Sequence, residues 1–500
     1  MAGPFTLTAL PSSPTGSVRT VASVVALLVP AALMAWPLIV VLVHGLTERG
    51  AWPLTLALDS LLIALAATLA ALVPATSIAL ALGRGAVIGR RTLQRVFGLG
   101  VFIPPFIVPL ALVTLGVRRG TTALVFGQAL AFLPIAVALL VRALREVPVE
   151  LEQAAEILGA RRWTVARRVT LALVGPGVLR AALVVLGLCL ADVATPLLLA
   201  GPRGVLATAV AASEGAAAPA LLLGLIATTI ALWARTWREV VPAIDDWPGQ
   251  RRPDRLAPDA TGAVLGALAW AVAIVLAASW LLVPVMALAH VSVLGDRAIQ
   301  HTLGRSVLLG LGAAVAGTML ALVTGWIVER RRSAAAGAVA LMLHLPVAVP
   351  GVVAGVGYLL VVRRGPGSLE GGALLAAMLL VACWELPVTS RLARQRLARV
   401  DHSIEEAALG LGASGGTTLT RIVLPTLAPA AAGIFAHTFA AGVVAVGAVI
   451  VLTGPGPGLG AIALLTLAAA GATGAACAVA TVLLAVAGGA VWLGRTPAVR

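Results

Sequence analysis

The residues that could do chemistry in this chain are a few carboxylates and histidines set inside long apolar runs. Asp192 and Glu385 each stand in such a run, as do Glu214, His344 and His437. An ionisable side chain in a membrane-spanning segment is costly to bury, so each of these residues is a candidate for function. The alternative for Asp192 is a hydrogen bond between packed helices, and for Glu385 it is snorkelling or pairing with Arg391. For Glu214, His344 and His437 it is an ordinary packing role.

The sequence lacks the residue sets that catalysis or metal binding would need. No nucleophile, base and acid form a constellation, and Cys189, Cys383 and Cys477 stand far apart in separate apolar runs, where buried, unreactive thiols are typical. All 35 basic residues are arginine, whereas a phosphate-binding loop of the type GxxxxGK[ST] needs a lysine. We therefore expect no catalytic residue, no metal site, no cofactor and no ATP hydrolysis by these 500 residues.

The composition is that of a membrane protein. Hydrophobic residues make up 60% of the chain and charged residues only 11%, whereas a globular domain carries about 25% charged residues. The apolar runs are continuous over the length of a spanning helix, which favours helices over alternating strands. The net charge of +15 comes from arginines clustered in the loops between the runs. It therefore indicates membrane orientation rather than nucleic-acid binding.

We predict about twelve transmembrane helices, with both termini in the cytoplasm. That orientation places most of the arginines on the cytoplasmic side, as the positive-inside rule requires. The predicted spans are 20–45, 56–83, 96–117, 121–141, 177–200 and 207–233, then 263–290, 304–328, 336–361, 372–390, 430–452 and 459–492. Kinks in the third and ninth spans are predicted from Pro105, Pro109, Pro346 and Pro350.

An internal repeat relates the two sets of six spans. A shift of 253 residues places Gly159 on Gly412 and Pro134 on Pro387. Because six is an even number, both halves cross the membrane in the same direction and are parallel repeats. We expect a first half over 1–240, a cytoplasmic linker over 241–262 and a second half over 263–500.

Each half has a long cytoplasmic loop between its fourth and fifth spans, near 148–172 and 401–425. In the second loop Ser403 and Glu406 have the spacing of a capping box, which predicts a short helix beginning at Ser403. Gly412 is suited to end that helix in a left-handed conformation. A short, exposed, amphipathic helix with small side chains is suited to docking on another surface, and a solvated linker helix is the alternative.

These loops resemble the cytoplasmic signature of permease subunits of binding-protein-dependent ABC importers, which reads E-A-A, three residues, Gly and a later Leu-Pro. The second loop carries the signature as Glu406, Ala407, Ala408, Gly412, Leu424 and Pro425. The first loop carries Ala154, Ala155 and Gly159 but departs from the signature at Gln153 and Ala172. Two copies in one chain resemble the fused permeases of the ferric-iron and thiamine uptake group.

The resemblance implies an all-α membrane fold of the type I ABC importer permease, made of two parallel six-helix repeats in the bacterial inner membrane. It implies that both loops form coupling helices in clefts of separate ATPase subunits, which we expect to be a homodimer. A periplasmic or lipid-anchored solute-binding protein is the third expected partner, with membrane lipid around the spans. The coupling residues are then Glu152, Gln153, Ala154, Ala155, Gly159, Glu405, Glu406, Ala407, Ala408 and Gly412.

The resemblance also implies that Asp192 faces the translocation pathway, and we extend that expectation to Glu385. Ferric iron and thiamine both remain open as substrates. A secondary transporter with parallel repeats, driven by an ion gradient, is the alternative function.

Overall fold

The computed structural model describes residues 29, 31–47, 53–84, 87–201, 204–212, 217–233, 260–330, 334–343, 345–364, 369–399, 401–453 and 458–494. Every regular element within these ranges is helical. Seven helices are long and apolar enough to cross a membrane, and a helix pair bent by 51° makes an eighth. The expected all-α membrane fold is confirmed.

The two halves contribute similar series of helices. The first series is η1 (Ala31–Ala35), α2 (Trp36–Thr47), α3 (Leu54–Gly83), α4 (Arg90–Gly100), α5 (Ile107–Thr114), α6 (Thr121–Arg145), α7 (Val149–Ile157), α8 (Arg162–Val165), η2 (Ala166–Thr170), α9 (Leu171–Ala191), α10 (Ala194–Leu199), α11 (Leu206–Ala212) and α12 (Ala217–Trp233). The second series is α13 (Ala260–Leu288), η5 (Val291–Gly295), α14 (Arg297–Arg330), α15 (Ala334–Met342), α16 (Leu345–Ala348), α17 (Gly351–Arg364), α18 (Leu369–Trp384), α19 (Leu386–Leu397), α20 (His402–Gly410), α21 (Gly415–Thr418), η6 (Leu419–Val423), α22 (Leu424–Val443), α23 (Ile450–Thr453), α24 (Gly460–Ala469) and α25 (Thr473–Gly494).

Several predicted spans are broken into shorter helices. The span predicted over 96–117 is interrupted between α4 and α5, where Pro105 lies, because proline lacks the N–H that a continuous helix uses. The single span predicted over 459–492 is wrong, since α24 and α25 are separate helices and Gly471 between them has φ +86°. Four further apolar helices are only 10–17 residues long. The number of twelve crossings therefore stays a prediction.

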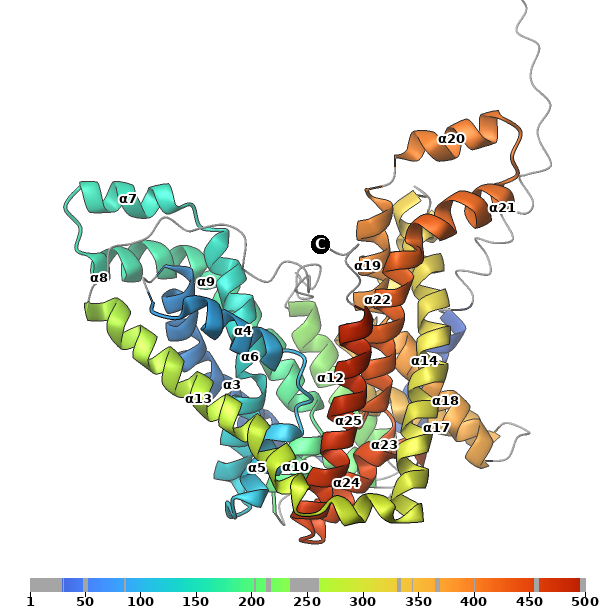
Figure 1. Ribbon diagram of the computed structural model, residues 1–500, viewed down its shortest axis with the longest axis horizontal. Helices are drawn as coiled ribbons and strands as arrows, with labels where there is room; N and C mark the ends of the chain where they lie inside the picture. Colours follow the sequence, from blue (N-terminus) through green and yellow to red (C-terminus); the bar gives the residue numbers. More distant parts are fainter. Residues whose placement is uncertain are drawn as a thin grey trace, which may run out of the picture.

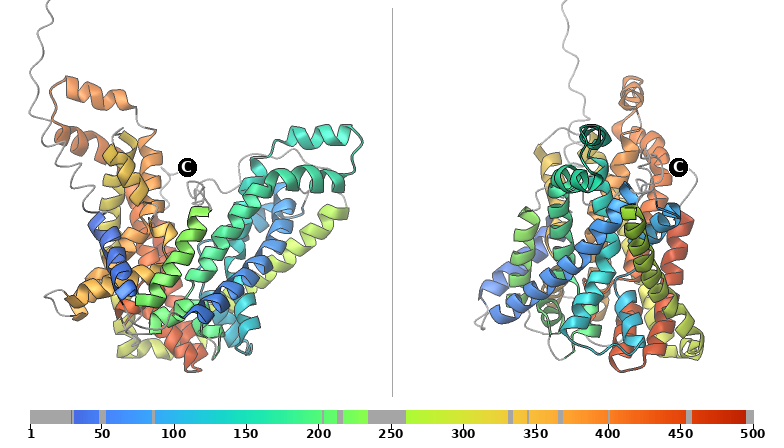
Figure 2. Two further views of the ribbon diagram at one scale, coloured as in Figure 1. Left: turned by 180° about the vertical axis from the view of Figure 1, so that it is seen from behind. Right: turned by 90° about the vertical axis from the view of Figure 1, so that its left-hand side faces the viewer.

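The helices form two arms that diverge from a common base (Figure 1). α7 stands at the far end of one arm and α20 at the far end of the other, while α5, α10 and α24 lie at the base. The other views show the same arrangement (Figure 2). Both loops between the fourth and fifth spans are thus at the same end of the molecule, as parallel repeats require.

The first helix of each half packs against the opposite half. α13 lies against α3, α4 and α5, and the indole Nε1 of Trp270 donates a 2.9 Å hydrogen bond to the carbonyl of Ile88. Conversely, α2 lies against α17, and the hydroxyl of Tyr358 donates a 2.6 Å hydrogen bond to the carbonyl of Leu33. This exchange ties the two arms together.

Small residues let the long helices approach closely. A Cβ atom added to Gly310 of α14 would lie 2.9 Å from the carbonyl oxygen of Phe439 in α22. One added to Gly317 would lie 2.9 Å from the methyl group of Thr438. In lipid, helices associate through such close packing rather than through the hydrophobic effect. The abundant glycines of the sequence therefore have a direct role at this contact.

Candidate functional site

The two cytoplasmic loops fold as matched short helices, α7 and α20, each ended by a glycine. Gly159 has φ +87° and Gly412 has φ +86°. The amide of Ala160 donates to the carbonyl of Ala155, and that of Ala413 to the carbonyl of Ala408, both at 3.0 Å. This bond from the residue after the glycine back to the last helical turn is the mark of a Schellman motif. The left-handed termination predicted at Gly412 is confirmed.

The structural match between the loops extends beyond these helices. α7, α8 and η2 are related to α20, α21 and η6 by the same shift of 253 residues at both of their ends. η2 and η6 are π-helical turns, which are rare and often found at functional sites. The repeat seen in the sequence is therefore a repeat of backbone conformation in this region.

The N-terminus of α20 differs from the prediction. α20 begins at His402, and the amide of Ser403 donates a 3.0 Å hydrogen bond to Oδ1 of Asp401. The capping box predicted for Ser403 and Glu406 is therefore wrong, because the aspartate two residues earlier supplies the capping oxygen. An aspartate is as good an N-cap as a serine, so the spacing alone did not distinguish the two.

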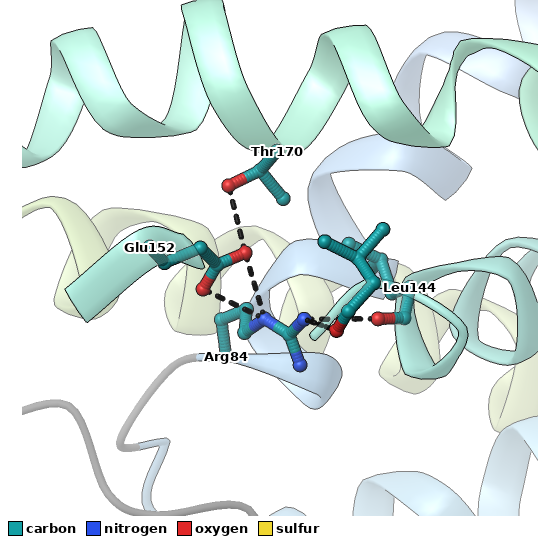
Figure 3. A network of polar contacts seen from close by, with 5 residues as sticks. Arg84, Leu144, Glu152 and Thr170 are labelled. Atoms are coloured by element: carbon teal, nitrogen blue, oxygen red, sulfur yellow. Dashed lines mark hydrogen bonds and ion pairs between the residues drawn. The ribbon is translucent and has the colours of Figure 1, made fainter. Parts of the chain in front are cut away.

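Glu152 of α7 is held by Arg84, whose side chain is 12% exposed (Figure 3). Only 4% of Glu152 is exposed, and its Oε2 lies 2.9 Å from Nε of Arg84, the residue that follows α3. Nη2 of Arg84 donates to the carbonyls of Leu144 and Val147 at the end of α6, at 2.9 and 2.8 Å. The hydroxyl of Thr170 donates a 2.8 Å hydrogen bond to Oε1 of Glu152. One ion pair thus joins α3, α6 and α7.

The second half repeats this ion pair. Glu405 of α20 is 8% exposed, and its Oε1 lies 3.0 Å from Nε of Arg330, the last residue of α14. Nη2 of Arg330 donates to the carbonyl of Leu397 at 3.0 Å. Glu405 and Leu397 are related to Glu152 and Leu144 by the 253-residue shift. Together we call these two arrangements the Arg–Glu clamps.

The clamps are sensitive to the loss of either partner. Removing one member of a buried ion pair leaves an uncompensated charge, at a cost of about 3–5 kcal/mol. Each arginine also donates to carbonyls at a helix C-terminus, where a positive charge is favourable. The carboxylate that fixes each helix is therefore the one just before the E-A-A position. Sequence reasoning named Glu152 and Glu405 but did not find their arginine partners, because the partners lie about 70 residues away in the chain.

The outward face of each short helix carries the family signature. Gln153 and Glu406 are exposed, as are Ala154 and Ala407, whereas Ala155 and Ala408 are half-buried. The same face presents apolar side chains that sequence reasoning missed. Leu151 and Ile404 are 48% and 49% exposed, and Leu158 and Leu411 are 87% and 89% exposed, each pair related by the 253-residue shift. Exposed apolar clusters outside the membrane mark surfaces for protein contacts.

Asp192 has a structural task at the break between α9 and α10. Its Oδ1 accepts hydrogen bonds from the amides of Ala194 and Thr195, at 3.0 and 3.2 Å. Nε2 of Gln128 donates to its Oδ2 at 3.4 Å, and Asp192 is only 8% exposed. These bonds account for the carboxylate as the N-terminal cap of α10, and the expected pathway role stays a prediction.

The structure brings together two of the candidate residues, Glu385 and His437. Glu385 lies between α18 and α19, and its Oε2 is 2.9 Å from Nε2 of His437 in α22. Both side chains are 24% exposed. Pairing of Glu385 with Arg391 stays a prediction. Glu214 and His344 lie outside the described residues.

Comparison with known proteins finds similarity over most of the chain. Residues 75–236 match the family described as binding-protein-dependent transport system inner membrane component. The chain is 27% identical to the putative ferric transport system permease protein FbpB 1 of Haemophilus influenzae, over 73% of this chain and 65% of the relative. It is 26% identical to the ferric transport system permease protein FbpB of Actinobacillus pleuropneumoniae, over 67% of this chain and 52% of the relative.

A shorter match involves a molybdate/tungstate transport system permease protein of Thermococcus kodakarensis, 28% identical over 32% of this chain and 64% of the relative. The chain thus spans less than two thirds of the length of each of these relatives. None of the three names mentions thiamine.

The matched region contains α7 and its clamp, and the ferric relatives match most of the chain. The chain is therefore a multi-pass inner-membrane protein whose residues 75–236 are similar to the membrane component of binding-protein-dependent transport systems and which resembles the ferric uptake permeases of ABC importers.

Proposed function

We propose that this chain is the permease of an ABC importer and that α7 and α20 dock on two separate ATPase subunits. The single observation that carries the proposal is the matched pair of exposed, glycine-terminated helices at the same end of the two arms. The lack of lysine supports it, because a chain without a P-loop lysine needs another polypeptide to hydrolyse ATP.

The two docking faces fit two copies of one ATPase. Leu158 and Leu411 occupy equivalent positions, as do Leu151 and Ile404. Because the same apolar side chains stand at matching positions of α7 and α20, the two helices fit identical clefts. The ATPase is therefore a homodimer. The helices differ at Gln153 and Glu406, where only the second half has a charge, and at Glu150 and Ser403, where only the first half has one.

Ferric iron is the proposed substrate, delivered by a periplasmic or lipid-anchored binding protein. The two relatives that match most of this chain are named as ferric permeases. Thiamine, the other substrate expected from the sequence, has no support among the relatives compared. We also propose the two halves over 1–240 and 263–500 joined by a cytoplasmic linker over 241–262, which places α7, α20 and both termini in the cytoplasm.

The test is reconstitution of the chain in proteoliposomes with an ABC ATPase and a ferric-binding protein from the same organism. We expect uptake of radioactive ferric iron that requires both ATP and the binding protein. Uptake driven by a proton or sodium gradient with the chain alone would overturn the proposal in favour of a secondary transporter. If the chain is purified from cells that also express the ATPase and no ATPase comes with it, that result would also contradict the proposal.

A further inference from the structure

The second spans α3 and α14 make matched polar contacts at both of their ends. Arg84 and Arg330 form the Arg–Glu clamps at one end. At the other end, Ser60 and Ser306 accept hydrogen bonds from backbone amides of other helices. A shift of 246 residues relates both the serines and the arginines. The sequence repeat therefore preserves a pair of contacts on one helix, at a fixed separation.

The serine contacts hold the short helices near the base of the arms. Oγ of Ser60 accepts from the amide of Leu206, the first residue of α11, at 2.8 Å. Oγ of Ser306 accepts from the amide of Gly460, the first residue of α24, at 2.9 Å. The amides at the start of a helix have no partner within it, so a serine from another helix is a specific attachment. Ser60 is 6% exposed and Ser306 is fully buried.

The two ends of each second span lie on opposite sides of the membrane. Ser60 and Arg84 are 24 residues apart in sequence, which is about 36 Å along a helix, compared with a hydrocarbon core of about 30 Å. α14 is continuous over 34 residues and contains no proline. α3 is also continuous, over 30 residues, but contains Pro74, so α14 is the stiffer of the two. In this inference a displacement at the arginine end of each helix moves its serine end.

We propose that α3 and α14 are the levers of the transport cycle, joined to the docking helices by the Arg–Glu clamps and to α11 and α24 by Ser60 and Ser306. In this inference, which rests on the proposed function, movement of α7 and α20 by the ATPase is passed through the clamps to the second spans. The second spans then pull α11 and α24 at the base. α24 contacts α10 of the first half, so its displacement opens or closes the contact between the halves.

The clamp can be tested without any ATPase. Met319 of α14 and Leu411 beyond α20 are 67% and 89% exposed, and the three native cysteines are all buried. Spin labels on Met319→Cys and Leu411→Cys therefore report the position of the docking helix relative to its lever. We expect one narrow distance distribution in the otherwise native chain and a distribution at least twice as broad after Glu405→Gln. An unchanged distribution would show that the ion pair does not hold the helix.

The whole lever is tested in the reconstituted importer by the ratio of iron taken up to ATP hydrolysed. We expect Glu405→Gln and Ser306→Ala each to lower this ratio at least tenfold. ATP hydrolysis should stay stimulated in Ser306→Ala, because Ser306 lies at the end of α14 away from the docking helix. Thr324→Val is the matched control, since this buried threonine of the same helix bonds only to the carbonyls of Leu320 and Ala321 in its own helix. Its ratio should match that of the native chain.

The outcomes separate the lever from the proposed function. If Glu405→Gln lowers the ratio of uptake to hydrolysis and Ser306→Ala does not, the proposal that α14 passes movement to α24 is wrong. The Arg–Glu clamp would then act only on the docking helix. An equal loss in Thr324→Val would show that any change in α14 disturbs the fold, which also overturns that proposal. If the native chain binds no ATPase, the proposed function fails, while the spin-label distances still decide whether the clamp exists.

Discussion

The hydroxyl of Thr170 donates a 2.8 Å hydrogen bond to Glu152, and this bond has no counterpart in the second half. The 253-residue shift places Val423 where Thr170 stands, and both residues are buried. The first clamp thus has a hydrogen bond from a hydroxyl that the second lacks, although the arginine and the carboxylate are common to both.

Thr170→Val should loosen α7 but leave α20 unchanged. A hydrogen bond to a charged group contributes about 1.5–3 kcal/mol, so we expect amide hydrogen exchange in 149–157 to become at least tenfold faster. Hydrogen-exchange mass spectrometry of the purified chain gives both helices in one measurement. The peptide covering 402–410 is the internal control. Equal acceleration of both peptides would point to general destabilisation and contradict the assignment of the bond.

Gly412→Val should abolish stimulated ATP hydrolysis while membrane abundance stays near normal. The left-handed conformation costs a residue with a Cβ roughly 1–2 kcal/mol, and nothing lies within 4 Å of a Cβ added at Gly412. The strain is therefore local to the turn, and its effect is to misalign α20.

Gly412→Asn is the matched control, because asparagine tolerates positive φ better than valine. We expect it to keep most of the stimulated activity. Abundance and ATP hydrolysis should be measured in the same membranes. If abundance falls in parallel with activity for Gly412→Val, the glycine is needed for folding and the docking explanation loses its support.

Glu406→Ala should uncouple ATP hydrolysis from uptake more than Gln153→Ala. Both side chains are exposed at equivalent positions, so neither change removes a buried contact, but of the two only Glu406 is charged. The difference should shrink at high ionic strength, since exposed charge pairs are screened. If the two variants have equal ratios of uptake to ATP hydrolysis, the replacement of the signature glutamate by Gln153 has no effect on coupling.

Glu385 and His437 should be energetically coupled. We expect the free energies of unfolding of Glu385→Gln, His437→Gln and the double variant to be non-additive by at least about 0.5 kcal/mol, as for residues in direct contact. Unfolding in denaturant, followed by tryptophan fluorescence, supplies the four values. Additive effects would show that the two side chains are independent.

The purified chain alone should neither bind nor hydrolyse ATP. The reason is the absence of lysine from all 500 residues, which leaves no P-loop for the phosphates. Phosphate release above a detergent-only control, or binding of a fluorescent ATP analogue, would contradict the division of roles between this chain and an ATPase.

The sequence predicted what depends on local pattern and repetition. The α-helical membrane class follows from the apolar runs, and the position of each docking helix follows from the E-A-A pattern and its glycine. The left-handed turns at Gly159 and Gly412 follow from glycine chemistry. The start of α20 was misassigned because Asp401 and Ser403 are both good caps.

The contacts that hold the site could not be predicted in the same way. Arg84 and Glu152 are 68 residues apart, and nothing in their local sequence links them. The pairing of Glu385 with His437 likewise depends on how α22 packs beside the break before α19. The break at Asp192 was read as an uninterrupted span, because a buried aspartate in an apolar run gives no sign that it caps a helix rather than lines a pathway.

The exchange of α2 and α13 has a consequence for the order of synthesis. The surface of α3, α4 and α5 that receives α13 is made before residues 260–288 leave the ribosome. Until then, the face of the first half that binds α13 has no helix against it. The hydrogen bond from Trp270 to the carbonyl of Ile88 forms only after the second half has begun to insert. Neither half can complete its native packing from its own residues, so the two mature together as one unit of biogenesis.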